Sequence, residues 1–295
     1  MHTTSVKHRA TNWLDREEYP FQSHYMRINE QRIHYLDEGK GDILLFVHGT
    51  PLWSFVYRKL IKKLSTKYRC IALDHLGFGL SDKPKDYNYT AQQQAKNLEL
   101  FIKTLHLKNF RLIVHDFGGP IGLNYALKYP QEIRQLVVFN TWMWSNENDP
   151  KFQKMRKIIA SPLVPFLYKY LNFSAKILIP KSWGSSSKLS TTIHKQYCKP
   201  FGNAGERMGT LGFRNALLNE QAWFESLWEK RANLKQIPAL LLWGEEDPYI
   251  RLEFMQRFAQ IFDQVETQSF PKVGHLVPDE AGEEVLVHLE KFLKR

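Results

Sequence analysis

The chain has 295 residues, of which 43% are hydrophobic and 24% charged, and its formal net charge is +11. The hydrophobic and charged fractions are ordinary for a soluble globular protein. The length is ample for a hydrophobic core. The first twenty residues hold no apolar signal-peptide core, and no window approaches the roughly 18 uncharged apolar residues of a membrane span. We therefore expect a cytoplasmic protein of one large α/β domain, or a core with an insertion, and no integral membrane segment.

A strand pair is predicted near the start of the chain, where MRINEQRIHYLDEG carries a polar turn at residues 29–31. Short apolar runs then alternate with longer helical patterns, and these runs are nearly continuous, as in strands buried on both faces of a parallel sheet. One helical pattern follows Thr90, an expected N-cap, with Gln93 three residues later as in a capping box. The strand-like runs are DILLFVHG, YRCIALDH, FRLIVHD, IRQLVVFN, PALLLWG and VETQSFP. The alternation predicts an open α/β sheet with helices on both faces.

The two cysteines, Cys70 and Cys198, lie far apart in the sequence, and neither has a pattern of Cys or His ligands around it. Cys70 falls in an apolar run and is expected to be a small core residue. We therefore expect no disulfide framework and no metal site.

The alternation stops over residues 141–234, a stretch without clear strands that is rich in aromatic residues, proline, serine and lysine. Helical patterns such as PKFQKMRKIIA occur in it, and it is too long for a plain loop. We therefore expect a helical insertion that lies over the sheet.

The excess of positive charge concentrates between Glu147 and Lys235. It indicates either an anionic surface or nucleic acid as a partner, or a solvated basic outer face. Because no nucleic-acid-binding motif accompanies the charge, we expect the solvated face and no nucleic-acid partner. Within this region SPLVPFLYKYLNFSAKILIPKSW mixes aromatics, leucines and lysines as interfacial helices do, although the inner face of the insertion with solvated lysines explains the same pattern.

Polar residues follow four of the strand-like runs, at the carboxyl ends where open α/β sheets gather functional groups. In LIVHDFGGPIGL, Asp116 stands at the tight corner between a strand and a helix, in the small-x-nucleophile-x-Gly pattern of the nucleophile elbow. Gly118 and Gly119 allow the helix to pack against the strand, and the helix N-terminus favours the negative charge of Asp116. Taken alone, a helix N-cap aspartate explains Asp116 equally well.

The residues at two further strand ends favour the interpretation of Asp116 as a nucleophile over that of an N-cap. Triads of the α/β-hydrolase fold follow the order nucleophile, acid, histidine, and Asp116, Asp247 and His275 occur in that order. Asp247 comes shortly after an apolar strand, with Glu245 and Glu246 as competitors for its role. His275 follows the last strand and precedes an amphipathic helix, DEAGEEVLVHLEKFLKR. We therefore predict Asp116, Asp247 and His275 as the catalytic residues.

The turn HGTP at residues 48–51 supplies another part of such a site. The backbone N–H groups of Thr50 and Phe117 are predicted to form an oxyanion hole, although a tight strand-to-helix turn explains HGTP as well. A carboxylate nucleophile suits displacement at a saturated carbon, which gives a covalent ester on Asp116. A water molecule activated by His275 would then hydrolyse that ester.

Together these motifs resemble the haloalkane dehalogenase branch of the α/β-hydrolases, whose nucleophile is an aspartate. The resemblance covers nearly the whole chain and is carried by HGTPLWSFVYRKLI, YRCIALDHLGFGLSDKP, LIVHDFGGPIGL, LLLWGEEDPYI and VGHLVPDE. It implies the α/β-hydrolase fold, with a mostly parallel eight-stranded sheet. It also implies a core of residues 1–140 and 235–295 and a helical cap of residues 141–234, inserted after the sixth strand.

The resemblance implies the same triad, no cofactor, and a small hydrophobic substrate; we expect a monomer or weak dimer. Some members take the acid from the end of the sixth strand. Here that place reads Phe139, Asn140, Thr141, without a carboxylate, which favours Asp247.

Two departures from the family concern the leaving group. Family dehalogenases usually place tryptophan directly after the nucleophile, where its indole N–H holds the halide, but this chain has Phe117. A second donor is often the asparagine of the HG-x-P motif, which is Thr50 here. Trp183, close to the position of a halide-binding cap tryptophan in one subgroup, and Trp142 are candidates for substrate or halide contacts. Simple packing of the cap on the core explains these tryptophans and Trp144 as well.

Three functions remain open on these residues. The leading interpretation is a haloalkane dehalogenase that forms an alkyl-enzyme ester. The same triad would serve a β-lactone decarboxylase, which YRCIALDHLGFGLSDKP and the FNT after the sixth strand resemble, or an epoxide hydrolase with Tyr168, Tyr170 and Tyr197 available as acids. A ligand-binding homologue without catalysis belongs to a different class, and the intact triad argues against it.

Overall fold

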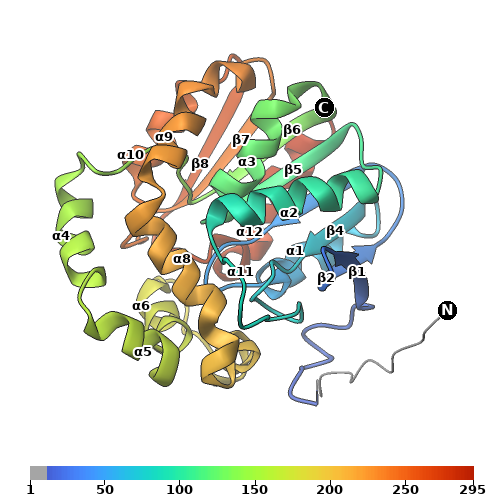
Figure 1. Ribbon diagram of the computed structural model, residues 1–295. Coiled ribbons are helices and arrows are strands. Elements are labelled where there is room, and N and C mark those ends of the chain that lie inside the picture. The colour runs from blue at the N-terminus through green and yellow to red at the C-terminus, as the bar shows by residue number, and fades with distance from the viewer. Residues whose placement is uncertain (1–11) are drawn as a thin grey trace.

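Eight strands form the centre of the computed structural model, which describes residues 12–295 (Figure 1). Their order is β1-β2-β4-β3-β5-β6-β7-β8; β2 pairs antiparallel with β1 and with β4, and the other pairings are parallel. The strands are β1 (His24–Ile28), β2 (Gln31–Glu38), β3 (Ile43–Val47), β4 (Arg69–Leu73), β5 (Phe110–His115), β6 (Ile133–Phe139), β7 (Ala239–Gly244) and β8 (Val265–Phe270). The prediction of a mostly parallel eight-stranded sheet is confirmed.

Burial follows the position of each strand in the sheet. Every residue of the central strands β5 and β7 is buried, whereas the edge strands β1 and β8 are largely half-buried or exposed. Cys70 in β4 is a core residue, as predicted. The β1–β2 turn consists of Asn29 and Glu30, which both have positive φ (47° and 69°) as tight hairpins require. Gln31 already pairs with Ile28, so the turn is one residue shorter than predicted.

Helices cover both faces of the sheet. In Figure 1, α2 (Ala91–Thr104) packs against α3 (Gly118–Lys128) in front of the sheet, and α1 (Arg58–Leu64) packs against α12 (Gly282–Leu293) behind it. α10 (Leu252–Ala259) contacts β7 and β8, and the short α11 (Val277–Glu280) precedes α12. Thr90 caps α2 as predicted, because its hydroxyl accepts the Gln93 N–H at 3.1 Å, while the Gln93 side chain donates to Asn97.

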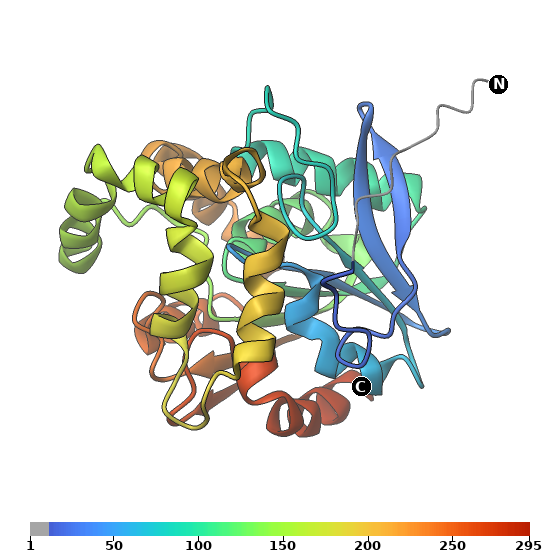
Figure 2. The ribbon, with the colours of Figure 1, turned by 90° about the horizontal axis from the view of Figure 1, so that it is seen from below.

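The chain between β6 and β7 is helical. Its helices are α4 (Pro150–Ile159), α5 (Leu163–Leu171), the π-helical turn η3 (Ser174–Leu178), α6 (Ile179–Ser182), α7 (Thr191–Cys198), α8 (Met208–Asn219) and α9 (Gln221–Glu229). Short 3-10 turns complete the described chain: η1 (Ser54–Tyr57), η2 (Pro130–Glu132), η4 (Lys199–Phe201), η5 (Ala204–Arg207) and η6 (Arg231–Leu234). α4 and α5 stand at the margin of the molecule, away from the sheet (Figures 1 and 2). Over residues 12–295, no helix combines the length and the apolar character needed to cross a membrane.

A buried ion pair joins α1 to α11. The Arg58 side chain, 1% exposed, donates from Nη1 to Asp279 Oδ2 at 2.7 Å and from Nε to Glu18 Oε2 at 2.8 Å. Tyr197, from the helical region, donates its hydroxyl to the same Asp279 oxygen at 2.6 Å. Because Asp279 lies four residues after His275, this cluster helps to hold the segment that carries His275.

Replacing Arg58 by methionine should therefore lower the free energy of unfolding by about 3–5 kcal/mol, because the buried Asp279 charge would lose its main partner. The matched control is Arg156→Met, which breaks an ion pair with Glu147 whose side chains are 43% and 49% exposed; it should cost less than about 1 kcal/mol. Urea unfolding followed by circular dichroism measures both. Similar small losses for the two variants would contradict the role given to Arg58.

Candidate active site

Asp116 occupies the corner between β5 and α3, with a positive φ of 52°. Non-glycine residues seldom adopt this conformation, and it is found at functional sites where the surroundings enforce it. Two glycines allow the corner to be so tight. A Cβ on Gly118 would lie 2.0 Å from the Val47 carbonyl oxygen, and one on Gly119 would lie 1.8 Å from Thr141 Oγ1. The corner thus has the geometry of a nucleophile elbow, and Asp116 is not an ordinary N-cap.

The two carboxylate oxygens of Asp116 face different partners. Oδ1 accepts the Thr50 N–H at 2.7 Å, and the Phe117 N–H is close enough to contribute to the lowered pKa of this carboxyl. Oδ2 lies 3.4 Å from His275 Nε2. The structure thus brings the predicted oxyanion-hole donors, Thr50 and Phe117, to the predicted nucleophile.

His275 connects Asp116 to Asp247. Its Nδ1 lies 2.6 Å from Asp247 Oδ2, and Asp247 Oδ1 accepts the N–H groups of Tyr249 and Ile250 at 2.8 and 3.0 Å. Of the two competitors for the acid, Glu245 accepts the Ser269 hydroxyl and Glu246 binds Ser185. Asp116, His275 and Asp247 are therefore the three residues that meet.

Asn140 is a site residue that the sequence analysis missed. Its Nδ2 donates to Asp247 Oδ2 at 2.8 Å, and its Oδ1 accepts the Gly244 N–H at 2.9 Å. The side chain therefore fixes the Asp247 carboxylate relative to the end of β7. The signal in the sequence was a polar residue directly after β6, the strand beside β7.

Two buried histidines hold the backbone of the site. His48 Nδ1 lies 2.7 Å from the Gly49 carbonyl oxygen and its Nε2 accepts the His75 N–H at 3.0 Å, which fixes the turn that presents Thr50. His115 Nε2 donates to the His275 carbonyl oxygen at 2.8 Å. Burial and the nearby His275 lower the pKa of His115 to about 3, so its ring is neutral at physiological pH.

The electrostatics of the site follow from its burial and its two acidic side chains. Burial lowers the pKa of His275, but the charge of Asp247 and the hydrogen bonds to Asp116 and Asp247 outweigh burial and raise that pKa to about 10. Burial raises the pKa of Asp116, but the hydrogen bond and charge of His275 hold it below its usual value. At neutral pH His275 is therefore an imidazolium beside an ionised Asp116.

Asp116 and His275 lie in the wall of a cavity of about 570 Å³. The cavity is enclosed by the turn after β3, the ends of β5 and β7, and helices α4, α5 and α6. Its lining is mainly apolar and includes Leu52, Phe152, Met155, Val164, Leu167, Phe173, Leu178, Leu217 and Ile250. A volume and lining of this kind suit a small hydrophobic molecule.

The two candidate tryptophans have different positions. Trp142 lines the cavity and lies edge-on to Phe117, with ring centroids 4.9 Å apart. The Trp142 indole N–H and the hydroxyl of Thr50, which also lines the cavity, have no hydrogen-bond partner among the described residues. Trp183 lies outside the lining, and its indole N–H donates to Ser187 Oγ at 3.3 Å. The structure therefore does not bring Trp183 to the cavity that Asp116 and His275 line.

The three tyrosines considered as acids do not converge on the site. Tyr168 lines the cavity, and burial raises its pKa above the usual value. Tyr170 is 53% exposed on the outer side of α5, and Tyr197 donates its hydroxyl to Asp279. Only one of the three is therefore placed to act as an acid toward an epoxide.

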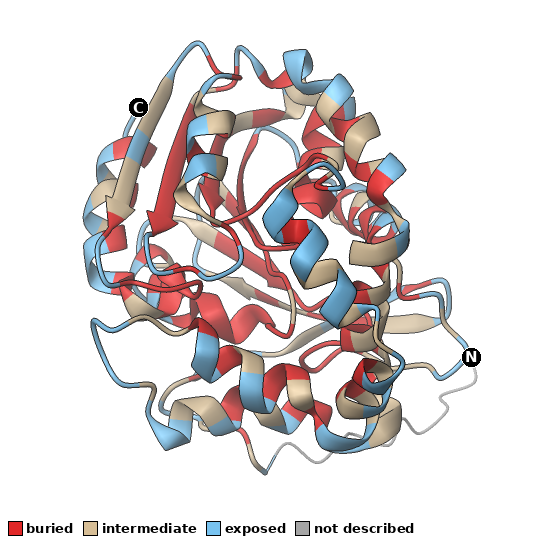
Figure 3. Cartoon of the chain, turned by 90° about the vertical axis from the view of Figure 1, so that its left-hand side faces the viewer, coloured by how far each residue is buried: buried red, intermediate tan, exposed pale blue. Residues whose placement is uncertain are grey.

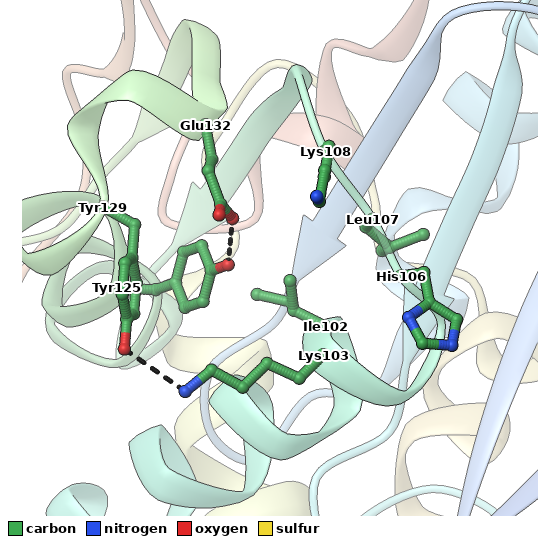
Figure 4. Close-up of a pocket in the computed structure, with 8 residues that line it drawn as sticks. All are labelled: Ile102, Lys103, His106, Leu107, Lys108, Tyr125, Tyr129 and Glu132. Carbon is green, nitrogen blue, oxygen red and sulfur yellow. Dashed lines mark hydrogen bonds between the residues drawn. The ribbon is translucent and has the colours of Figure 1, made fainter.

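A second hollow, of about 200 Å³, lies near the amino end of β5, on the edge of the sheet opposite the triad (Figure 4). Its wall includes Lys103, which donates to Tyr129, and Glu132, which accepts from Tyr125. These bonds pair four of the lining side chains with one another. In residues 12–295, no group of three or more His, Cys, Asp or Glu side chains is arranged to hold a metal ion.

The known proteins that this chain resembles agree on its family. The sequence model of the α/β hydrolase fold family matches residues 42–281. A haloalkane dehalogenase 2 of Mycobacterium bovis is 31% identical, over 94% of this chain and 97% of that protein. A cis-3-alkyl-4-alkyloxetan-2-one decarboxylase of Shewanella oneidensis is also 31% identical, over 93% of this chain and 89% of that protein.

A solved structure supports the same fold. A mutant of the haloalkane dehalogenase DatA from Agrobacterium tumefaciens superimposes with a TM-score of 0.83 at 24% identity, covering 93% of this chain and 97% of that one. The sheet order, the elbow at Asp116 and these relatives agree. The chain therefore belongs to the α/β-hydrolase fold family, in the part of it that holds haloalkane dehalogenases and related enzymes.

Proposed function

We propose that this enzyme hydrolyses the bond between a saturated carbon and a leaving group, as a haloalkane dehalogenase does, with Asp116 as nucleophile, His275 as base and Asp247 as the acid that orients His275. The observation that carries the proposal is the division between the Asp116 oxygens: Oδ1 accepts the Thr50 N–H at 2.7 Å, while Oδ2 lies 3.4 Å from His275 Nε2. The mycobacterial relative, which carries the name haloalkane dehalogenase, supports this reaction class.

In the first step, Asp116 Oδ2 attacks the substrate carbon. The carbon–halogen bond breaks, its electron pair leaves with the halide, and Asp116 becomes an alkyl ester. The largely apolar cavity keeps bulk water from the reacting carbon. We infer that residues 141–234 act as a cap over a core of residues 1–140 and 235–295, since α4, α5 and α6 supply much of this apolar wall.

In the second step, His275 Nε2 takes a proton from water, and the hydroxide attacks the carboxyl carbon of the ester. The negative charge develops on Asp116 Oδ1, where the N–H groups of Thr50 and Phe117 stabilise it. The intermediate then expels the alkoxide, which takes the proton from His275 and leaves as the alcohol. The restored carboxylic acid ionises, so one proton is released with each halide.

The charges of the site explain how His275 can be a base although its pKa is about 10 beside an ionised Asp116. Once Asp116 is an ester, its negative charge is gone, and His275 loses one of the two groups that stabilise the imidazolium. The pKa of His275 then falls toward neutrality, so Nε2 gives its proton to solvent and can afterwards accept one from the attacking water. His275 therefore becomes a base at the stage of the reaction at which the ester has to be hydrolysed. At the end of the cycle the proton of the restored Asp116 carboxylic acid passes to His275, so the net release is one proton.

The departing anion needs a donor in place of the missing tryptophan after Asp116. We infer that the Trp142 indole N–H supplies it, together with the Thr50 hydroxyl, because both residues line the cavity and these two buried groups lack partners among the described residues. An unpaired buried donor costs about 1–3 kcal/mol, which an anion in the cavity would recover.

A second candidate keeps the triad and changes the substrate to a β-lactone. The observation that favours it is Phe117, whose ring offers no N–H to a halide, and a β-lactone expels none. The Shewanella relative carries the name of such a decarboxylase. The two candidates differ in product: halide and alcohol in one case, and decarboxylated lactone in the other.

Incubation with a panel of short bromoalkanes, chloroalkanes and β-lactones tests the proposal. Halide release by the wild-type enzyme should fall by at least ~10³-fold in Asp116→Ala, which lacks the nucleophile. His275→Ala should accumulate an ester on Asp116, visible in intact-protein mass spectrometry as the added mass of the alkyl group. Lactone turnover without halide release would favour the second candidate, and an unmodified Asp116 with every substrate would exclude both.

The donor role of Trp142 is tested by Trp142→Phe, which keeps a ring but removes the N–H. The rate of halide release should fall about tenfold to a hundredfold, because a hydrogen bond to a charged group contributes about 1.5–3 kcal/mol. Trp183→Phe is the matched control, since it removes an indole N–H outside the cavity, and should leave the rate within about twofold. Equal rates for the wild type and Trp142→Phe would refute the assignment.

The proposed change in the basicity of His275 can be measured without substrate. Asp116→Asn imitates the loss of charge on esterification, and histidine NMR should show the His275 pKa well below the wild-type value of about 10. Asp149→Asn is the control, because Asp149 also lines the cavity but is paired with Arg251 at 2.7 Å. An unchanged His275 pKa in Asp116→Asn would contradict the mechanism.

A further inference from the structure

One side of the helical region exposes an unusual number of apolar side chains. Six of the ten exposed large hydrophobic residues within 12–295 lie between positions 158 and 177. We call them the outer apolar face: Ile158 (68% exposed), Leu163 (59%), Phe166 (51%), Tyr170 (53%), Leu171 (53%) and Ile177 (41%). Figure 3 views the molecule from the side on which α4 lies and shows exposed positions along the near helices.

Helix α5 is apolar on both of its sides. Leu163, Phe166 and Tyr170 follow the spacing i, i+3, i+7 and so share one side of the helix, which is exposed. Val164 and Leu167 belong to the cavity wall on the inner side. A helix that is apolar all round is normally buried. The inner apolar residues are explained by the cavity, and the outer ones require a partner.

The sequence that carries the outer apolar face has charges of one sign. Residues 151–200 contain nine lysines, one arginine and no aspartate or glutamate, so this stretch accounts for nearly all of the net charge of +11. Lys154, Lys157, Lys176 and Lys181 are exposed beside the apolar residues. A partner that fits this surface therefore carries negative charges spread over a wide area, with an apolar layer directly below those charges.

We propose that the outer apolar face and its lysines dock on the surface of an anionic phospholipid bilayer. The lysines meet anionic headgroups, and the leucine, phenylalanine and tyrosine side chains enter the boundary between headgroups and acyl chains. Nucleic acid matches the charge, and its bases could stack on Phe166 and Tyr170, but it would leave the isoleucine and leucine side chains in water. α5 has nine residues, about 13 Å of helix, so it lies in the interface and does not cross the bilayer.

The docking surface adjoins the cavity that holds Asp116. Ile158 belongs to both, being 68% exposed and part of the cavity lining, and Met155 and Leu167 continue that lining inward. An apolar substrate dissolved in the bilayer therefore meets an apolar route toward the site along α4 and α5. This last step rests on the proposed function, whereas docking itself does not.

Co-sedimentation of the full chain with vesicles tests the docking independently of catalysis. Vesicles are made of phosphatidylcholine alone or with about a third phosphatidylserine. The protein should bind the anionic vesicles more tightly than the neutral ones, and raising the salt from ~0.05 to ~0.5 M should weaken binding, because the lysine contacts are screened. No binding to anionic vesicles, or equal binding to both, would overturn the proposal.

Two matched pairs of variants locate the surface. The first pair changes apolar residues. The triple change Leu163→Ser, Phe166→Ser and Leu171→Ser should lower binding to anionic vesicles at least about tenfold. Its control, Leu100→Ser with Val287→Ser, changes exposed apolar residues elsewhere (40% and 69% exposed) and should not lower binding.

The second pair changes lysines to glutamine. Changing Lys154, Lys157 and Lys176 should lower binding about tenfold at low salt. Changing Lys96, Lys108 and Lys291, which are also exposed, should have less effect.

Circular dichroism and thermal melting confirm that each variant is folded before its binding is compared. Leu163, Phe166 and Leu171 lie outside the cavity lining, so turnover of a water-soluble substrate should stay unchanged in the apolar triple variant. If the wild type fails to bind vesicles but self-associates through this face, as measured by analytical ultracentrifugation with the same variants, the face is an interface between copies of the chain and the proposal is wrong.

Discussion

The arrangement of one imidazole between two buried acidic side chains is the constraint on which the rest of this structure depends. The His275 side chain is 6% exposed and those of Asp116 and Asp247 are 11% and 0% exposed, so these groups have given up most of their hydration. Removing charges from water is costly unless each finds a partner. Much of the surrounding polar structure supplies those partners: backbone N–H groups at Thr50 and Phe117 for one acid, and Asn140 with two more N–H groups for the other.

The same constraint ties together parts of the fold that are distant in sequence. β5 supplies the corner, β6 supplies Asn140 and β7 leads to Asp247, and these three strands are neighbours in the sheet. Ser182 at the end of α6 accepts the His275 N–H, and Tyr197 in α7 bonds to Asp279 beyond it. The helical region is thus attached directly to the segment that bears His275, and a shift of these helices would move His275 as well as the cavity wall.

The helical region has two chemically similar sides in different surroundings. Its inner side forms much of the apolar wall around Asp116, a lining that suits a small hydrophobic molecule. Its outer side is apolar too, and is bordered by lysines without any acidic residue over fifty positions. Phe117 adds to the apolar character, packing between Trp142 and Phe213, and it moves the question of the leaving group from the residue after the nucleophile to Trp142.

The amino-acid sequence by itself determined the sheet, the helical stretch after β6 and the meeting of Asp116, Asp247 and His275. Continuous apolar runs and small residues at a corner are local features, and parallel strands bring their carboxyl ends to one edge. Only the tertiary structure placed Trp142 in the cavity wall and Trp183 outside it, brought Asn140 to Asp247, and turned one side of α5 to solvent. These outcomes depend on which distant segments share a wall of the cavity, and helical spacing predicts which residues share a side of a helix but not what that side faces.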